Sequence, residues 1–239
     1  MNCASIVRKE IYGYLISAVF YGTAVFFILF ASVWLFYFQR FFAMNTANLH
    51  AFFAAFPLAF ILVVPAITMR SWAEERKTGT VELLLTMPFS EWDLVLGKFL
   101  AAFAAVAVMI AATVPVPLTL IPLGHFDGGV ILGEYLGALF LGASAVSLAL
   151  FLSCCSKNQS VAFLGSAVVL LGAILVSQFI MGLNLPEWLG GMLNFFSLAF
   201  HFETFSRGII DTRDLAFFLL TTVLFLFLTT RVLIYRKWG

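Results

Sequence analysis

The sequence has 239 residues, of which 63% are hydrophobic and only 10% are charged, with a formal net charge of +1. Soluble domains usually carry about 25% charged residues, so this chain has too few to cover a water-facing globule. The near-zero net charge also excludes a nucleic-acid-binding protein, because such proteins need a clustered basic surface. The composition therefore indicates a protein embedded in a lipid bilayer.

Six long apolar windows follow one another along the chain and predict an all-α integral membrane protein. A helix of about 20 apolar residues crosses the roughly 30 Å of hydrocarbon, and helices satisfy their own backbone groups in lipid. A closed barrel would need alternating polarity, which runs such as 215–220 lack. Pro115 and Pro117 should kink the third span. The predicted spans are 14–38, 51–69, 98–122, 134–153, 159–183 and 214–232.

The stretch before the first span predicts a helix over 4–13 that lies in the plane of the lipid headgroups. Val7, Ile11, Tyr14 and Leu15 recur at helical spacing, and charged residues fill the remaining arc. The alternative is that this stretch is only the charged end of the first span.

The distribution of basic residues orients the chain, because cytoplasmic ends carry an excess of Lys and Arg. With the N-terminus inside, three basic residues fall outside: Arg40, Arg207 and Arg213. The inside then holds Arg8, Lys9, Arg70, Arg76, Lys77, Lys98, Lys157, Arg231, Arg236 and Lys237. This bias predicts a multi-pass protein with both termini in the cytoplasm.

The spans offer no catalytic or metal-binding constellation. None of the six windows carries a charged residue or histidine away from its edges, so no proton relay is evident. Ser144 resembles an intramembrane nucleophile, but the three histidines fall near the predicted outer surface, so a hydrolase would lack its base. Small residues on the fourth span predict close helix packing instead. These are Gly137, Ala138, Gly142, Ala145 and Ala149.

The predicted cytoplasmic loop, 70–97, has the clearest local signals. Gly79 is suited to end the helix that leaves the membrane, and Thr80 is suited to cap the next one. Pro88 keeps that helix short, and Ser90 with Asp93 caps the helix that follows. The short helix between them, 81–86, has one apolar face, and a helix of this length needs packing to be stable. Either that face lies on headgroups and neighbouring spans, or it docks in a groove on a soluble partner.

The run 70–88, followed by 95–99, resembles the signature of ABC-2-type ABC transporter permeases, and most closely their gliding-motility-type branch. The resemblance extends to 157–159 and 205–211. It implies a single ABC-2 transmembrane domain over 1–239, with a type V exporter-like fold, six transmembrane helices and an N-terminal interfacial helix. The implied location is the bacterial inner membrane, and the implied activity is export.

The resemblance also implies that the loop contacts a separate ATPase subunit. The residues implied in this coupling are Glu74, Glu75, Gly79, Thr80, Val81, Glu82, Leu83, Leu84, Leu85 and Pro88. The sequence has no Walker A motif, so ATP and magnesium are expected on the partner and no cofactor on this chain. Six helices are half of the family's usual twelve, which implies a second permease copy or a paralogue. An accessory subunit outside the membrane is compatible with this arrangement.

The predicted outer segment, 184–213, is rich in helix breakers and aromatic residues. In the resembling family such segments form short helices at the outer surface, which makes its phenylalanines candidates for a gate. These are Phe195, Phe196, Phe200, Phe202 and Phe205. The alternative is an aromatic belt that anchors an ordinary loop. For the whole chain, the alternative to a permease is a structural or regulatory membrane subunit of a larger gliding-type complex that transports nothing.

Overall fold

The computed structural model describes residues 3–39, 49–79, 90–123, 126–182, 187–206, 208 and 211–238, and every regular element within those ranges is helical. Six stretches there are long and apolar enough to cross a membrane. They are Ala18–Phe38, His50–Lys77, Glu91–Leu120, Gly128–Cys155, Gln159–Phe179 and Thr212–Tyr235. The predicted all-α class with six transmembrane helices is therefore confirmed.

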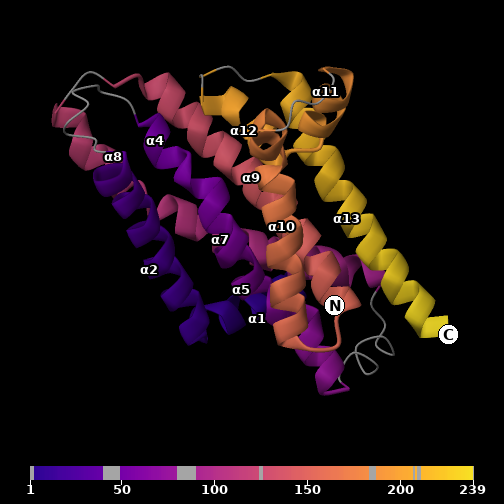
Figure 1. Ribbon diagram of the computed structural model, residues 1–239. Coiled ribbons are helices and arrows are strands. Elements are labelled where there is room, and N and C mark those ends of the chain that lie inside the picture. The colour runs from indigo at the N-terminus through magenta and orange to yellow at the C-terminus, as the bar shows by residue number, and fades with distance from the viewer. Residues whose placement is uncertain are drawn as a thin grey trace.

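The bundle has two distinct ends. Helix α1 (Cys3–Ile16) and the end of α13 (Thr212–Trp238) lie at the same end, and α11 (Glu187–Phe195) and α12 (Leu198–Ser206) lie at the opposite one (Figure 1). We name these the Lys98 end and the His201 end, after a buried polar side chain near each. An even number of spans returns the chain to the end at which it began.

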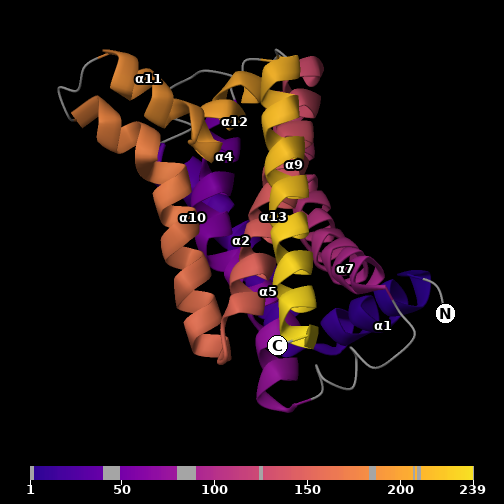
Figure 2. The same ribbon diagram turned by 90° about the vertical axis from the view of Figure 1, so that its right-hand side faces the viewer.

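Helix α1 lies across the Lys98 end, whereas α2 (Ala18–Val33) runs along the bundle (Figure 2). Ser17 separates them with an extended backbone of ψ 124°, which turns the chain. Helix α2 ends in one π-helical turn, η1 (Trp34–Phe38).

The protein-facing side of α1 differs from the predicted apolar face. Ile6 is buried, and Glu10 and Tyr14 follow it at intervals of four residues, so the three share one face of the helix. Leu15, assigned from its spacing to the apolar face, is exposed. A carboxylate therefore occupies the middle of the face that packs on the protein.

Two central helices carry most of the packing. Helix α5 (Ala55–Lys77), which follows the short α4 (His50–Phe53), packs along α9 (Gly128–Cys155). A Cβ on Gly137 would lie only 2.7 Å from Phe205 Cβ on α12. Small residues therefore let the neighbours approach α9 closely, as predicted.

The remaining spans surround this pair. Helix α7 (Glu91–Ala111) ends before three turn residues, and α8 (Pro115–Leu120) then begins with a proline, so the expected kink in the third span is present. The single turn η2 (Ile121–Leu123) follows α8. Helix α10 (Gln159–Gly182) packs on α5 and α9, and α13 packs mainly on α9.

Regular structure extends into the predicted loop 70–97. Helix α5 continues to Lys77, and α7 already begins at Glu91. The ends of an apolar window mark where side chains become polar, whereas a helix ends where its backbone groups are capped, and here the caps lie further along the chain.

Candidate functional site

The end of α5 is built by local capping contacts. The Thr78 hydroxyl donates to the carbonyl of Glu74 at 3.0 Å, and Gly79 has a φ of 71° in the left-handed region. Gly79 thus ends the helix as predicted. Seven of the proposed coupling residues fall in 80–89, which lies outside the described residues: Thr80, Val81, Glu82, Leu83, Leu84, Leu85 and Pro88.

The helix that follows this stretch is capped as well. The Asp93 backbone N–H donates to Ser90 Oγ at 3.1 Å, and the Ser90 hydroxyl donates to Asp93 Oδ2 at 2.8 Å. This is the cap that the spacing of the two residues predicted. The described residues on both sides of 80–89 therefore belong to helices with defined ends.

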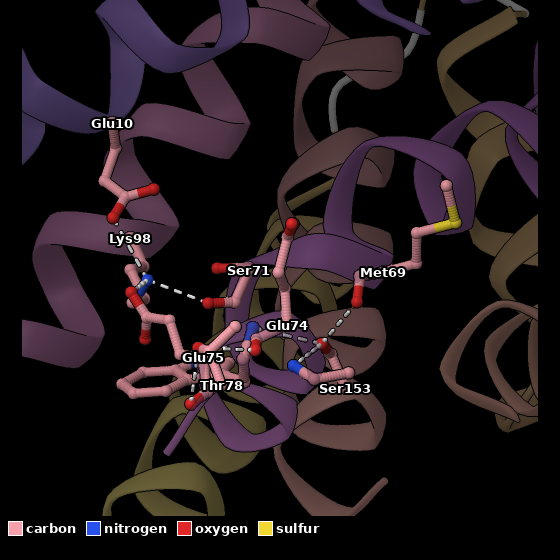
Figure 3. A network of polar contacts seen from close by, with 10 residues as sticks. Glu10, Met69, Ser71, Glu74, Glu75, Thr78, Lys98 and Ser153 are labelled. Carbon is pink, nitrogen blue, oxygen red and sulfur yellow. Dashed lines mark hydrogen bonds and ion pairs between the residues drawn. The ribbon is translucent and has the colours of Figure 1, made fainter. Parts of the chain in front are cut away.

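A buried ammonium joins the two helices that flank 80–89 (Figure 3). Lys98 on α7 is 2% exposed, and its Nζ donates to Glu75 Oε1 on α5 at 2.8 Å and to Glu10 Oε1 on α1 at 3.0 Å. It also donates to the carbonyl of Ser71 at 2.8 Å. The ammonium lies 4.9 Å from the centre of the Trp72 ring. We name these five residues the Lys98 cluster.

The ammonium of Lys98 is fully hydrogen-bonded within the Lys98 cluster. An ammonium has three donors, and here each has an acceptor, two of them ionisable carboxylates. A charge this deeply buried is tolerated only when it is paired and hydrogen-bonded. Burial also raises the pKa of the Tyr14 phenol beside the cluster, so the phenol stays neutral. The result is a link between α1, α5 and α7.

The same stretch of α5 is also bound to the end of α9. Arg76 Nη1 donates to the carbonyls of Cys154, Cys155 and Ser156 at 3.2, 3.1 and 2.7 Å. These carbonyls lie at a helix C-terminus, where cations bind favourably. The Ser153 hydroxyl donates to the carbonyl of Met69 at 3.3 Å and accepts from the backbone N–H of Trp72 at 3.3 Å. The end of α5, which leads into 80–89, is thereby linked to α1, α7 and α9.

The three described coupling candidates thus differ in their surroundings. Glu75 is part of the Lys98 cluster, and Gly79 ends α5, but Glu74 is exposed. Two further residues, Arg76 as a capping cation and Lys98 as the centre of the cluster, were not predicted from the sequence. The available signal was a lysine followed directly by a long apolar run.

The five phenylalanines proposed as a gate do not share one environment. Phe195, Phe196 and Phe200 are exposed, whereas Phe202 and Phe205 are buried. The buried pair fixes α12 to the bundle, since Phe205 packs on Gly137. The exposed three are the part of this set that could contact lipid or another chain.

A buried imidazole holds the same region together. His201 Nδ1 lies 2.6 Å from Asp214 Oδ1, and its Nε2 lies 2.9 Å from the carbonyl of Phe195. Because a carbonyl only accepts, Nε2 must carry a proton. The ring stacks on Phe217 at 3.9 Å between centres. These contacts link α11, α12 and α13, and no spacing in the sequence predicts them.

A second carboxylate is buried towards this end. The Glu134 side chain is 1% exposed on α9, and its Oε1 lies 3.5 Å from His50 Nδ1. The sequence placed Glu134 at a membrane boundary, but α9 begins at Gly128, so the residue lies almost two turns inside a helix. Tertiary packing, rather than the end of an apolar window, sets its environment.

The described residues contain no group of three or more His, Cys, Asp or Glu that could hold a metal ion. The Ser144 hydroxyl donates to the carbonyls of Phe140 and Leu141 in its own helix, which is a structural use of the side chain. The polar contacts among the described residues can transmit force between helices and hold charged groups in place.

Comparisons with known proteins give the family. The sequence model of ABC-2 family transporter proteins matches residues 42–234. Two curated relatives, each called probable multidrug ABC transporter permease YbhR, from Escherichia coli K12 and E. coli O157:H7, are 33% identical over 135 residues. The match covers 53% of this chain but only 34% of each relative, so the chain spans about a third of their length. With six apolar helices among its described residues this is a multi-pass membrane protein, and it belongs to the ABC-2 family of transporter proteins.

Proposed function

We propose that this chain is the membrane-spanning permease subunit of an ABC exporter, driven by ATP that is hydrolysed on a separate ATPase subunit. Family membership and six apolar helices support this assignment. The observation that carries it is the ion pair between Lys98 on α7 and Glu75 on α5, which joins the two helices that flank 80–89. A displacement of 80–89 is thereby passed to several helices together.

In this proposal the residues 80–86 form the coupling helix, with Leu84 on the face that docks and Glu82 beside it. The turn that leads from α5 to this helix is shaped by Glu74, Glu75 and Gly79. The chain itself then needs no catalytic chemistry, and ATP and magnesium belong to the partner.

The charge bias and the shape of the bundle support an orientation, and the family resemblance supports a location. The Lys98 end carries Arg76, Lys77 and Lys98, and α1 and the end of α13 lie at the same end (Figure 1). We therefore place the Lys98 end in the cytoplasm of a bacterial inner membrane, with 4–13 at the headgroups. The His201 end then faces outwards, with Phe195, Phe196 and Phe200 as the exposed candidates for an outer gate.

The assembly is proposed from the family pattern. Six spans are half of the usual set, so a second copy or a paralogous permease completes the path, and an accessory subunit outside is compatible with it. We assign the chain to the gliding-motility-type branch on the motif in 70–88. The relatives' name, probable multidrug permease, suggests a lipophilic cargo.

The test is reconstitution with the cognate ATPase in vesicles and measurement of ATP-dependent movement of a fluorescent lipophilic dye. We expect Glu82→Lys and Leu84→Asp to abolish movement while leaving expression and membrane insertion unchanged. The control is Glu203→Lys, which makes the same charge reversal on an exposed carboxylate of α12. Normal movement in both coupling variants would refute the docking role. An assembled wild-type complex that hydrolyses ATP and moves none of a broad panel of cargoes would favour a structural subunit instead.

A further inference from the structure

A cavity at the Lys98 end lies between α1, α2 and α5, beside the Lys98 cluster. Its volume is about 280 Å³, and Ser17, the residue at which α1 turns into α2, is part of its wall. The function of the Lys98 cluster as a mechanical link does not use this space.

The wall of the cavity is divided by polarity. Val19 and Phe20 of α2 and Ile67 of α5 are apolar, and they belong to membrane-spanning stretches. Arg70, Ser71 and Glu74 continue the α5 side with polar groups, on the side of the Lys98 cluster. Where spans meet a helix that lies across their end, acyl chains give way to headgroups. The cavity therefore matches the part of a lipid where chain and headgroup meet.

Among the described residues around the cavity, one cation and one anion have no ion-pair partner. Lys98 already has three acceptors, which include both Glu10 and Glu75. Arg70 and Glu74, one helical turn apart, form no ion pair within 4 Å with each other or with any other described residue. Such a pair offers a guanidinium and a carboxylate about 5–6 Å apart at their Cβ atoms.

A third polar group points to a ligand in the same wall. Ser71 is 6% exposed, and its Oγ is buried. Its hydroxyl interacts with the Tyr14 phenol and contacts no other described hydrogen-bonding group. A hydroxyl that accepts from the phenol keeps its own O–H as a donor, and an acceptor oxygen in the cavity would satisfy that donor.

We propose that this cavity binds the phosphoethanolamine headgroup of a membrane phospholipid. Arg70 binds the phosphate through its fork of N–H donors, Ser71 donates to a phosphate oxygen, and Glu74 accepts from the ammonium. The two-carbon linker of the headgroup spans a distance comparable to one helical turn. Three carboxylates line the cavity, those of Glu10, Glu74 and Glu75, and Lys98 already binds Glu10 and Glu75. A headgroup with a phosphate but no amine would therefore leave Glu74 without a cation. The acyl chains lie outside, along α2 and α5.

The test is a lipid titration of the purified full chain in detergent, followed by native mass spectrometry. We expect dioleoyl-phosphatidylethanolamine to bind on the order of fivefold more tightly than dioleoyl-phosphatidylglycerol. Arg70→Gln should weaken both lipids about tenfold, and Glu74→Gln should weaken only phosphatidylethanolamine, to the level of phosphatidylglycerol. Arg213→Gln and Glu203→Gln, which change exposed residues near the His201 end, should leave both affinities unchanged.

The controls separate the site from the fold and from the transport proposal. Lipid-free melting temperatures should match the wild type, and Arg70→Lys, which keeps the charge but loses the fork, should bind with intermediate affinity. Equal binding of the two lipids, or an unchanged affinity in Arg70→Gln, would overturn the proposal. Displacement of the lipid by an equimolar amount of soluble phosphoethanolamine would overturn the lipid as the source of the headgroup. Neither readout depends on the ATPase, so the outcome is independent of the proposed function.

Discussion

The two ends of this bundle are held together in different ways. At the Lys98 end, polar contacts join residues 23 and 88 positions apart through Lys98, and 78 to 80 positions apart through Arg76. At the His201 end, the imidazole contacts residues only 13 and 6 positions away, and aromatic rings surround it. The buried ammonium of one end joins distant helices, whereas the buried imidazole of the other joins neighbouring ones. The His201 end is attached to the rest of the bundle mainly by packing, such as that of Phe205 on Gly137, and by the contact between Glu134 and His50.

This difference bears on how movement passes through the molecule. A displacement of α5 at the Lys98 end acts on α1, α7 and α9 through charged hydrogen bonds, which are short and directional. At the His201 end, the His201–Asp214 pair, a 3.5 Å bond from the Ser197 hydroxyl to the Ile174 carbonyl and aromatic packing hold α11 and α12 to the bundle. Fewer charged hydrogen bonds must break there for the two helices to shift. We infer that the Lys98 end moves as a unit and that the His201 end is the more easily opened one.

The largest expected effect is at the Lys98 cluster. Lys98→Met leaves the Glu10 and Glu75 carboxylates facing each other without a cation, and removal of one partner from a buried ion pair costs about 3–5 kcal/mol. We expect a large fall in the melting temperature in nanodiscs, with faster hydrogen exchange in α1, α5 and α7 together. Lys77→Met, at an exposed position on α5, is the matched control.

Adding Glu10→Gln and Glu75→Gln to Lys98→Met should recover part of that loss, since no unpaired charge is then left. An unchanged melting temperature in Lys98→Met, or faster exchange confined to α7, would show that this end is not cross-linked as described.

A smaller and more local effect is expected at the His201 end. Asp214→Asn keeps the shape of the side chain but removes the charge that faces His201, and a weakened buried polar pair costs about 1–3 kcal/mol. Hydrogen exchange should accelerate in α11, α12 and the first turns of α13 only. Asp211→Asn, which preserves the oxygen that accepts from the Arg213 N–H, should have little effect. Faster exchange that spreads to α5 would contradict a local role for the His201–Asp214 pair.

The smallest expected effect concerns the contact between α5 and α9. Ser153→Ala removes the hydroxyl that bonds to Met69 and Trp72 on α5, which should cost about 0.5–1.5 kcal/mol in thermal stability. Ser144→Ala is a close control, because the Ser144 hydroxyl bonds only to carbonyls of its own helix. Equal melting temperatures for the two variants would mean that the Ser153 hydroxyl adds nothing to a contact that packing and Arg76 already hold.

Much of the fold could be predicted because its signals are local. The apolar windows gave the six spans, and caps such as Gly79 and Ser90 involve groups within four residues of each other. The small residues of α9 predicted close packing without naming the partner, which is Phe205 for Gly137. The division of the five phenylalanines into exposed and buried members depends on how α12 sits on α9, and no spacing within 184–213 encodes that.

The amino-acid sequence by itself determined that this chain lies in lipid, that it crosses as helices, and where several of those helices are capped, because hydropathy and capping depend on neighbouring residues. Tertiary structure alone decided which charges inside the bundle are paired. Lys98, Glu134 and Asp214 all lie near the edges of apolar windows, and the sequence treats them as boundary residues facing water. Packing buries each of them beside a polar partner from a different helix, and a buried charge is stable only where such a partner is brought to it.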